Sequence, residues 1–102
     1  MNTLDEAIYT IVKLLKLKDM TVRTFQKGRS VEITLHRPEH IEWFQYIIRR
    51  SMFLVIYKKK EFRRFTRFVI KRNYKYSFND YKKFVNRLKN FSRDEYFRSL
   101  GL

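Results

Sequence analysis

The chain contains no cysteine, one proline and only two glycines among its 102 residues. Without cysteine it has no disulfide framework, no thiolate nucleophile and no cysteine-ligated metal site. The two glycines, Gly28 and Gly101, are too few for a phosphate-cradling loop or a dinucleotide fingerprint. So few glycines and prolines also leave little room for long irregular loops, and we expect most of the chain to be regular structure.

Long apolar runs and a secretion signal are missing as well. The longest apolar run, residues 52–57, is far too short to cross a bilayer. Asp5 and Glu6 are acidic where a signal peptide needs a basic segment. With 44% hydrophobic and 18% aromatic residues, the composition is that of a folded domain rather than a disordered basic tail. We therefore expect a soluble, intracellular protein that forms a single domain over residues 1–102 and has no membrane association.

Groups that could support catalysis or bind a metal are sparse. The two histidines, His36 and His40, are four residues apart, but Pro38 starts a helix between them and no third ligand lies nearby in the sequence. Three neighbouring acids could in principle hold Mg²⁺ for a nuclease, although surface acids ordinarily pair with lysine and arginine: Glu32, Glu39 and Glu42. We expect no enzymatic activity, no metal and no cofactor.

Positive charge is concentrated in one stretch of the chain. Between Arg49 and Phe91 there are fifteen lysines or arginines and two acids, whereas residues 1–40 hold seven basic and five acidic residues. Sixteen of the eighteen aromatic residues lie at or beyond Trp43. A charge imbalance of this size calls for a polyanionic partner. Cations that hold phosphates and rings that stack on bases are typical of proteins that follow a nucleic-acid backbone.

The sequence predicts two groups of binding residues. Eight cations are predicted to contact the phosphates of DNA or RNA: Lys59, Lys60, Arg63, Arg64, Arg67, Lys71, Arg72 and Lys75. Four aromatic residues lie off the main apolar stripes and are predicted to be exposed for stacking or partner contact: Trp43, Tyr46, Tyr57 and Tyr74. The alternative is that lysine and arginine stems cover apolar surface and keep a small domain soluble. Mixed charges would suffice for solubility, so we favour phosphate binding.

The first half of the chain has clear local signals. Thr3 and Glu6 form a capping box at the start of a helix whose apolar positions recur at helical spacing: Leu4, Ile8, Ile11, Val12 and Leu15. Residues 20–27 and 30–36 are predicted to be the strands of a hairpin, since apolar and polar residues alternate over 31–35. Pro38 is then predicted to open a second helix, with Ile41, Phe44 and Ile48 as its apolar face.

The second half matches the first at an offset of 43. In this match Val31, Ile33 and Leu35 correspond to Tyr74, Tyr76 and Phe78, the turn falls on residues 71–72, and Phe25 and Phe68 are equivalent buried positions. A helix over residues 79–91, capped by Asn79 or Asp80, and a short tail helix near residues 94–97 would follow. In the alternative, residues 59–71 form a basic amphipathic helix and residues 52–57 a strand.

These elements predict an α+β fold of one small domain, in the order helix–hairpin–helix–hairpin–helix. Two helix–hairpin units, about residues 3–36 and about 40–78, would be related by an approximate internal repeat, with a C-terminal helix at about 79–91 plus a tail. The favoured function is non-enzymatic nucleic-acid binding through phosphates. The alternative is a protein–protein interaction module that takes a peptide or acidic partner in a groove between the two units.

In length, lack of cysteine, abundance of Lys, Arg, Tyr and Ile, and its two similar halves, the chain resembles small orphan proteins of filamentous viruses that infect hyperthermophilic archaea, of the Acidianus filamentous virus type. The resemblance covers the whole chain but rests on no motif, so it transfers no site residue. It implies a small, non-enzymatic viral accessory protein that acts in the host cytoplasm. Phage transcription regulators of similar size are a weaker resemblance.

Overall fold

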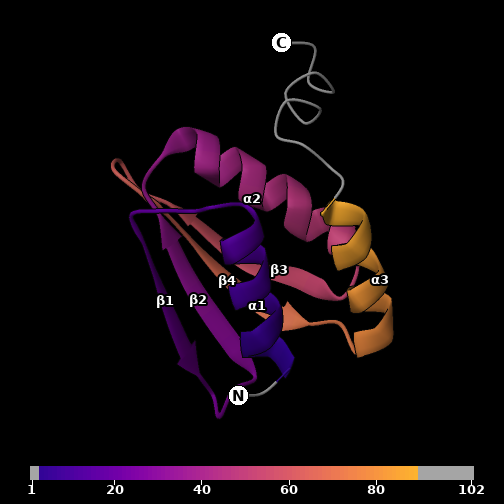
Figure 1. The fold of residues 1–102 in the computed structure, drawn as a ribbon. Helices are drawn as coiled ribbons and strands as arrows, with labels where there is room; N and C mark the ends of the chain where they lie inside the picture. The colour runs from indigo at the N-terminus through magenta and orange to yellow at the C-terminus, as the bar shows by residue number, and fades with distance from the viewer. Residues whose placement is uncertain (1–2, 90–102) are drawn as a thin grey trace.

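The computed structural model describes residues 3–89 of the chain. Three helices and four strands follow one another in the order shown in Figure 1: α1 (Thr3–Leu14), β1 (Met20–Phe25), β2 (Ser30–Leu35), α2 (Pro38–Ser51), β3 (Leu54–Glu61), β4 (Thr66–Arg72) and α3 (Phe78–Leu88). Among these residues no helix is long and apolar enough to cross a membrane. The tail helix predicted near residues 94–97 lies outside the described range.

The four strands form one antiparallel sheet in the order β1-β2-β4-β3. Its central pair, β2 and β4, runs in register from Ser30 opposite Lys71 to Leu35 opposite Thr66. Ile33 of β2 and Phe68 of β4 are opposite each other on the face that the three helices cover (Figure 1), and both are fully buried. No described helix packs on the other face, which is called the open face below.

Each helix contributes an apolar stripe to the core beneath the covered face. The stripes hold Leu4, Ala7, Ile8, Ile11 and Val12 of α1, Trp43, Phe44, Ile47 and Ile48 of α2, and Tyr81, Phe84, Val85 and Leu88 of α3. Helix α2 begins at Pro38, as predicted, because proline suits a first helical turn. In each stripe the buried positions recur at intervals of three and four residues, several of them as adjacent pairs, which places them on one side of the helix.

Helix α3 begins with a capping box formed by Ser77 and Asp80. The Ser77 hydroxyl accepts a hydrogen bond from the Asp80 backbone N–H at 3.2 Å, and the Asp80 carboxylate accepts one from the Ser77 backbone N–H at 2.8 Å. Hydrogen bonds from the Ser77 backbone and hydroxyl favour the ionised carboxylate and lower the pKa of Asp80. The predicted caps were Asn79 and Asp80; the cap is Ser77, and Asp80 is its partner in the first turn.

The predicted arrangement of two separate helix–hairpin units is wrong. Strands β2 and β4 pair along their whole length, so all four strands belong to one sheet that the three helices share. Backbone hydrogen bonds join the two hairpins where the prediction placed a groove between units. The pairing connects residues more than thirty positions apart in the sequence, which no local pattern indicates.

The repeat at an offset of 43 is also wrong. Tyr74 and Tyr76 lie in the turn before α3, and Phe78 is the first residue of α3, whereas their supposed counterparts form β2. The second hairpin turns at residues 62–65, not 71–72. Strands β3 and β4 occupy most of residues 59–71, the segment for which a helix was the alternative prediction. The reason is that β4 buries Thr66, Phe68 and Ile70, a spacing of two, while Phe65 lies in the turn.

The phenol of Tyr81 ties α3 to α1. Its hydroxyl donates a hydrogen bond of 2.6 Å to the backbone carbonyl of Ala7, and its ring lies 5.2 Å from that of Phe53. Burial disfavours the phenolate and raises the pKa of Tyr81 above its usual value of 10.0.

Replacing Tyr81 by phenylalanine should lower the free energy of unfolding by about 1 kcal/mol at neutral pH, because one buried hydrogen bond is lost. Above about pH 10 the wild type should lose stability faster than the variant, because the Tyr81 phenol ionises in the unfolded chain but stays protonated in the folded one, and phenylalanine has no group to ionise. Urea unfolding at neutral and alkaline pH measures both effects. Tyr9→Phe, at an exposed tyrosine of α1, is the control and should follow the wild type.

Candidate nucleic-acid interface

Side chains alternate between the two faces of the sheet, so the strand register identifies those on the open face. On this face Arg23 pairs with Glu32, and Lys71 pairs with both Ser30 and Val55. The other pairs on the face are found at every second position along β4. The open face therefore carries five cations and one carboxylate from residues 3–89: Arg23 of β1, Glu32 of β2, Lys58 and Lys60 of β3, and Arg67 and Lys71 of β4.

A β-bulge at Tyr57 sets which lysines of β3 reach the open face. Ile56 pairs with Ile70 and Lys58 with Val69, so Tyr57 is an extra residue without a partner of its own. After the bulge, Lys58 and Lys60 lie on the same face as Arg67 and Lys71. Tyr57 is 64% exposed, and the Lys71 ammonium nitrogen lies 3.9 Å from the centroid of its ring, which is a close cation–π contact.

The open face is hollowed between its edge strands. The hollow has a volume of about 300 Å³, and the described part of the chain lines it with two aromatic rings, three lysines, one arginine and the carboxylate of Glu32. We call it the open-face hollow; its lining residues are Phe25, Gln26, Ser30, Glu32, Tyr57, Lys58, Lys60, Arg67, Val69 and Lys71. An exposed cationic depression with rings in its wall has both features that single-stranded nucleic acids require of a binding surface.

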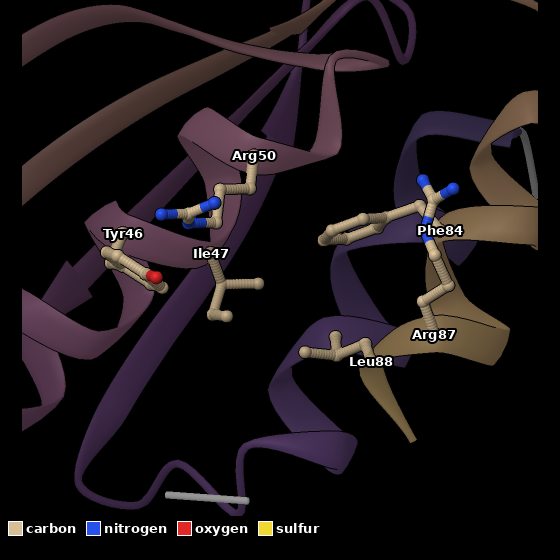
Figure 2. Close-up of a pocket in the computed structure, with 6 residues that line it drawn as sticks. All are labelled: Tyr46, Ile47, Arg50, Phe84, Arg87 and Leu88. Atoms are coloured by element: carbon tan, nitrogen blue, oxygen red, sulfur yellow. The ribbon is translucent and has the colours of Figure 1, made fainter. Parts of the chain in front are cut away.

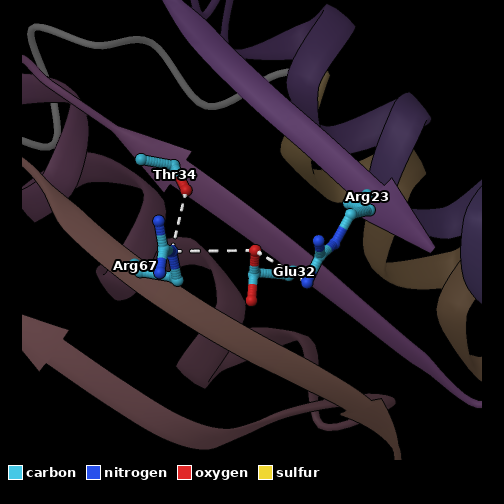
Figure 3. A network of polar contacts seen from close by, with 4 residues as sticks. All are labelled: Arg23, Glu32, Thr34 and Arg67. Atoms are coloured by element: carbon cyan, nitrogen blue, oxygen red, sulfur yellow. Dashed lines mark hydrogen bonds and ion pairs between the residues drawn. The ribbon is translucent and has the colours of Figure 1, made fainter. Parts of the chain in front are cut away.

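Glu32 lies between two arginines (Figure 3). One of its carboxylate oxygens, Oε1, is 3.7 Å from Arg23 Nη2 and 3.6 Å from Arg67 Nε, and Arg67 Nε also donates to the Thr34 hydroxyl at 3.4 Å. The two arginines therefore share one negative charge. Lys58, Lys60 and Lys71 have no carboxylate partner among residues 3–89, so their charges are available to an external anion.

The predicted lysine run is divided between the two faces. Lys60 lines the open-face hollow, together with the predicted Arg67 and Lys71. Lys59 instead lies on the covered face, where its ammonium is 2.9 Å from Glu61 Oε1 and 5.9 Å from the centroid of the Phe68 ring. Sequence reasoning missed Lys58 because only the bulge, which has no local signal, decides which members of the run face outward.

Arg63 and Arg64 lie in the β3–β4 turn at one end of the sheet, and both are exposed. Phe62 and Phe65 stack there with ring centroids 4.6 Å apart. The Arg67 guanidinium lies 5.6 Å from the first ring and 5.4 Å from the second, so the turn is joined to the cations of the open face. The turn extends the basic surface beyond the open-face hollow.

The structure places the last two predicted cations away from the open face. Arg72 pairs with Leu54 on the covered face, and its guanidinium lies 4.9 Å from the Phe53 ring and 5.0 Å from the Tyr74 ring. Lys75 lies in the turn before α3 and is exposed. Neither is brought together with Lys60 and Lys71. Arg23 does lie on the open face, but the sequence prediction missed it because it belongs to the half of the chain whose charges nearly balance.

The four predicted aromatic contacts are scattered. Trp43 is only 5% exposed and packs in the core, so the prediction that it is exposed was wrong. Tyr46 is partly buried beneath Arg50, and Tyr74 is 77% exposed next to Arg72. Of the four, Tyr57 lies on the open face. Phe25, expected in the core, is the second ring of the open-face hollow.

A second hollow, of about 270 Å³, lies between α2 and α3 (Figure 2). Ile47 of α2 projects toward Phe84 and Leu88 of α3 across it, and Arg50 and Arg87 lie beside these apolar side chains. We call this the α2–α3 hollow. It has the character expected of a peptide-binding groove, apolar with cations at its rim, but it separates two helices rather than two repeated units.

The two histidines are not brought together as a metal site. His36 is exposed after β2, with its ring 5.8 Å from that of Phe65, while His40 is buried in the first turn of α2. Within residues 3–89 no group of three or more His, Asp or Glu side chains is placed to hold a metal ion.

No protein-family model, curated protein or solved structure matches the chain. A function for this protein therefore has to be inferred from the geometry and charge of its own residues.

Proposed function

We propose that the protein binds nucleic acid through the open face of its sheet, without catalysing a reaction. The observation that carries the proposal is the excess of cations that residues 3–89 place on that face, five against the single carboxylate of Glu32, beside the rings of Phe25 and Tyr57. The corresponding location, also part of the proposal, is the cytoplasm of a virus-infected host cell, where nucleic acid is abundant.

The phosphates are the main contacts in this proposal. Lys58 and Lys60 occupy alternate positions on the edge strand β3, and Lys71 lies on the neighbouring strand β4 opposite Val55. All three line the open-face hollow and form its cationic border. Lysine holds a phosphate as a point charge, with little dependence on the sequence of the strand. A border of this kind orients the sugar–phosphate backbone along β3 and β4.

Binding to a labelled oligonucleotide, titrated with salt, tests the proposal. With three to five phosphate contacts, log K against log salt concentration should fall with a slope of about −2 to −4 for a single strand, because each contact releases condensed counterions. Fluorescence anisotropy measures the constants. Absence of binding at low salt, or binding that salt does not weaken, would contradict the proposal.

The α2–α3 hollow favours one second candidate, an acidic peptide with an apolar anchor residue. Ile47, Phe84 and Leu88 would take the anchor, and Arg50 and Arg87 would pair with acidic neighbours. The open face is favoured over this site because it has more uncompensated charge and belongs to a continuous basic surface. The test is the double variant Arg50→Ala with Arg87→Ala. If this variant no longer bound an acidic peptide partner while its nucleic-acid affinity stayed unchanged, the second function would be identified.

A further inference from the structure

The shape of the open face limits the form of nucleic acid that it can hold. The major groove of a duplex admits a helix or a two-stranded ribbon, and a four-stranded sheet is wider than either. The open-face hollow, at about 300 Å³, is at the lower end of the range for small-ligand sites. A group the size of one base fits that range, and a base enters a hollow only when it is unstacked, as in single strands and loops.

The walls of the hollow offer an unstacked base a ring to stack on and a polar group to contact. Tyr57 and Phe25 supply aromatic faces, and Val69 supplies apolar surface between the polar residues. Base–aromatic stacking contributes about 1–3 kcal/mol for each base, regardless of sequence. Stacking on these rings would therefore support binding, and any preference among bases has to come from the polar group.

Glu32 is that polar group. Both of its ion pairs with the arginines run to the same oxygen, Oε1, and Oε2 is the second acceptor of the carboxylate. The side chain is 20% exposed, so it can be reached from the hollow while Arg23 and Arg67 hold it in place (Figure 3). An ionised carboxylate only accepts hydrogen bonds, so a ligand group that contacts Oε2 has to be a donor.

The requirement for a hydrogen-bond donor distinguishes cytosine from thymine and uracil. Cytosine offers an exocyclic amine, the usual partner of a glutamate in base recognition. Thymine and uracil offer one N–H flanked by two carbonyl oxygens, which a carboxylate repels. The same carboxylate repels phosphates, so the backbone is directed toward Lys58, Lys60 and Lys71 and the base toward β2.

We propose that the open-face hollow holds one unstacked base of a single-stranded nucleic acid, and that Glu32 selects a base with an exocyclic amine, cytosine above thymine or uracil. The inference rests on the proposed function, because the lysines hold the phosphates on either side of the selected base. Glu32 is a specificity-determining residue in this arrangement and supplies little of the total affinity.

Fluorescence anisotropy with oligo-dC and oligo-dT of equal length, at neutral pH and fixed salt, tests the inference. The wild type should bind oligo-dC about tenfold more tightly, the lower part of the range for one well-recognised base. In Glu32→Gln the ratio should fall to about one, because an amide both donates and accepts and so accommodates either base. Glu6→Gln removes the same charge from an exposed position on α1 and should preserve the wild-type ratio.

The possible results of this experiment distinguish failure of the base-selection inference from failure of the proposed function. Equal wild-type affinity for the two oligonucleotides would overturn base selection and leave phosphate binding intact, as would an unchanged ratio in Glu32→Gln. Tighter binding of a duplex of the same length would overturn the single-strand assignment. Failure to bind any of the three would reject the proposed function itself. A thermal melt of Glu32→Gln checks that the sheet is folded, since glutamine keeps an oxygen for the two arginines.

Discussion

Changing Lys58, Lys60 and Lys71 together to alanine should weaken nucleic-acid binding by about 100-fold at low salt, if each exposed ionic contact contributes about 1 kcal/mol. These three lysines border the open-face hollow and have no carboxylate partner among residues 3–89. Their loss should also make the salt slope shallower by about 2, because a single-strand contact accounts for about 0.7 of the slope. The loss should be similar for different sequences, since phosphate contacts carry no base information.

The matched control removes three exposed lysines from the helical side of the molecule. Lys13 lies on α1, Lys18 in the following connection and Lys83 on α3. Changing these to alanine lowers the net charge by the same amount, so it separates the position of the charge from its total. Salt-titrated anisotropy on both variants makes the comparison. An equal loss in the two triple variants would mean that binding depends on net charge alone and would refute the open face as the interface.

Replacing Phe68 by alanine should lower the free energy of unfolding by about 3–5 kcal/mol, a large share of the stability of a small domain. Phe68 is 0% exposed at the centre of the sheet, and its ring lies 5.4 Å from that of Phe44 on α2. The truncation therefore opens a cavity between the sheet and the helix that covers it. Phe68→Leu keeps most of the volume and should cost less than half as much, which keeps the test informative if the alanine variant does not fold.

Phe25→Ala is the contrasting variant. The sequence made Phe25 and Phe68 equivalent buried positions, but Phe25 lies at the end of an edge strand and lines the open-face hollow. Its truncation should cost about 1 kcal/mol or less, within the usual range for partly exposed sites, while weakening oligonucleotide binding. Urea unfolding followed by circular dichroism measures both stabilities. Equal destabilisation by the two truncations would contradict the assignment of Phe25 to the open face.

Much of the local structure could be predicted because its signals are local. The alternation of Val31, Ile33 and Leu35 indicated β2, and Pro38 marked the start of α2. The burial of Trp43 could not be predicted from the stripe chosen for α2, because the stripe is broader than the three apolar residues used to define it and includes the polar His40. A tryptophan on the edge of a predicted stripe is buried or exposed according to which helices pack beside it.

The second hairpin was misplaced for a different physical reason. Strand β3 is an edge strand in which five consecutive residues, from Tyr57 to Glu61, are exposed, so burial leaves no alternation to detect. Its partner β4 alternates, but the adjacent Phe65 in the turn suggested a spacing of three. The charge concentration was visible in the sequence. Its division between two faces was not, because that depends on the pairing of β3 with β4.

The bulge at Tyr57 makes this surface sensitive to the register of β3 in a way that the fold is not. If a related chain kept all of these residues but paired β3 with β4 without the bulge, so that Tyr57 lay opposite Val69, the strands could still pair, but every later side chain would change sides. Lys58 and Lys60 would then point into the helical layer, and Lys59 and Glu61 would take their places outside. Two homologues that superpose closely and share the whole lysine run could therefore differ in their ligands, so the presence or absence of the bulge carries more functional information than substitutions in β3.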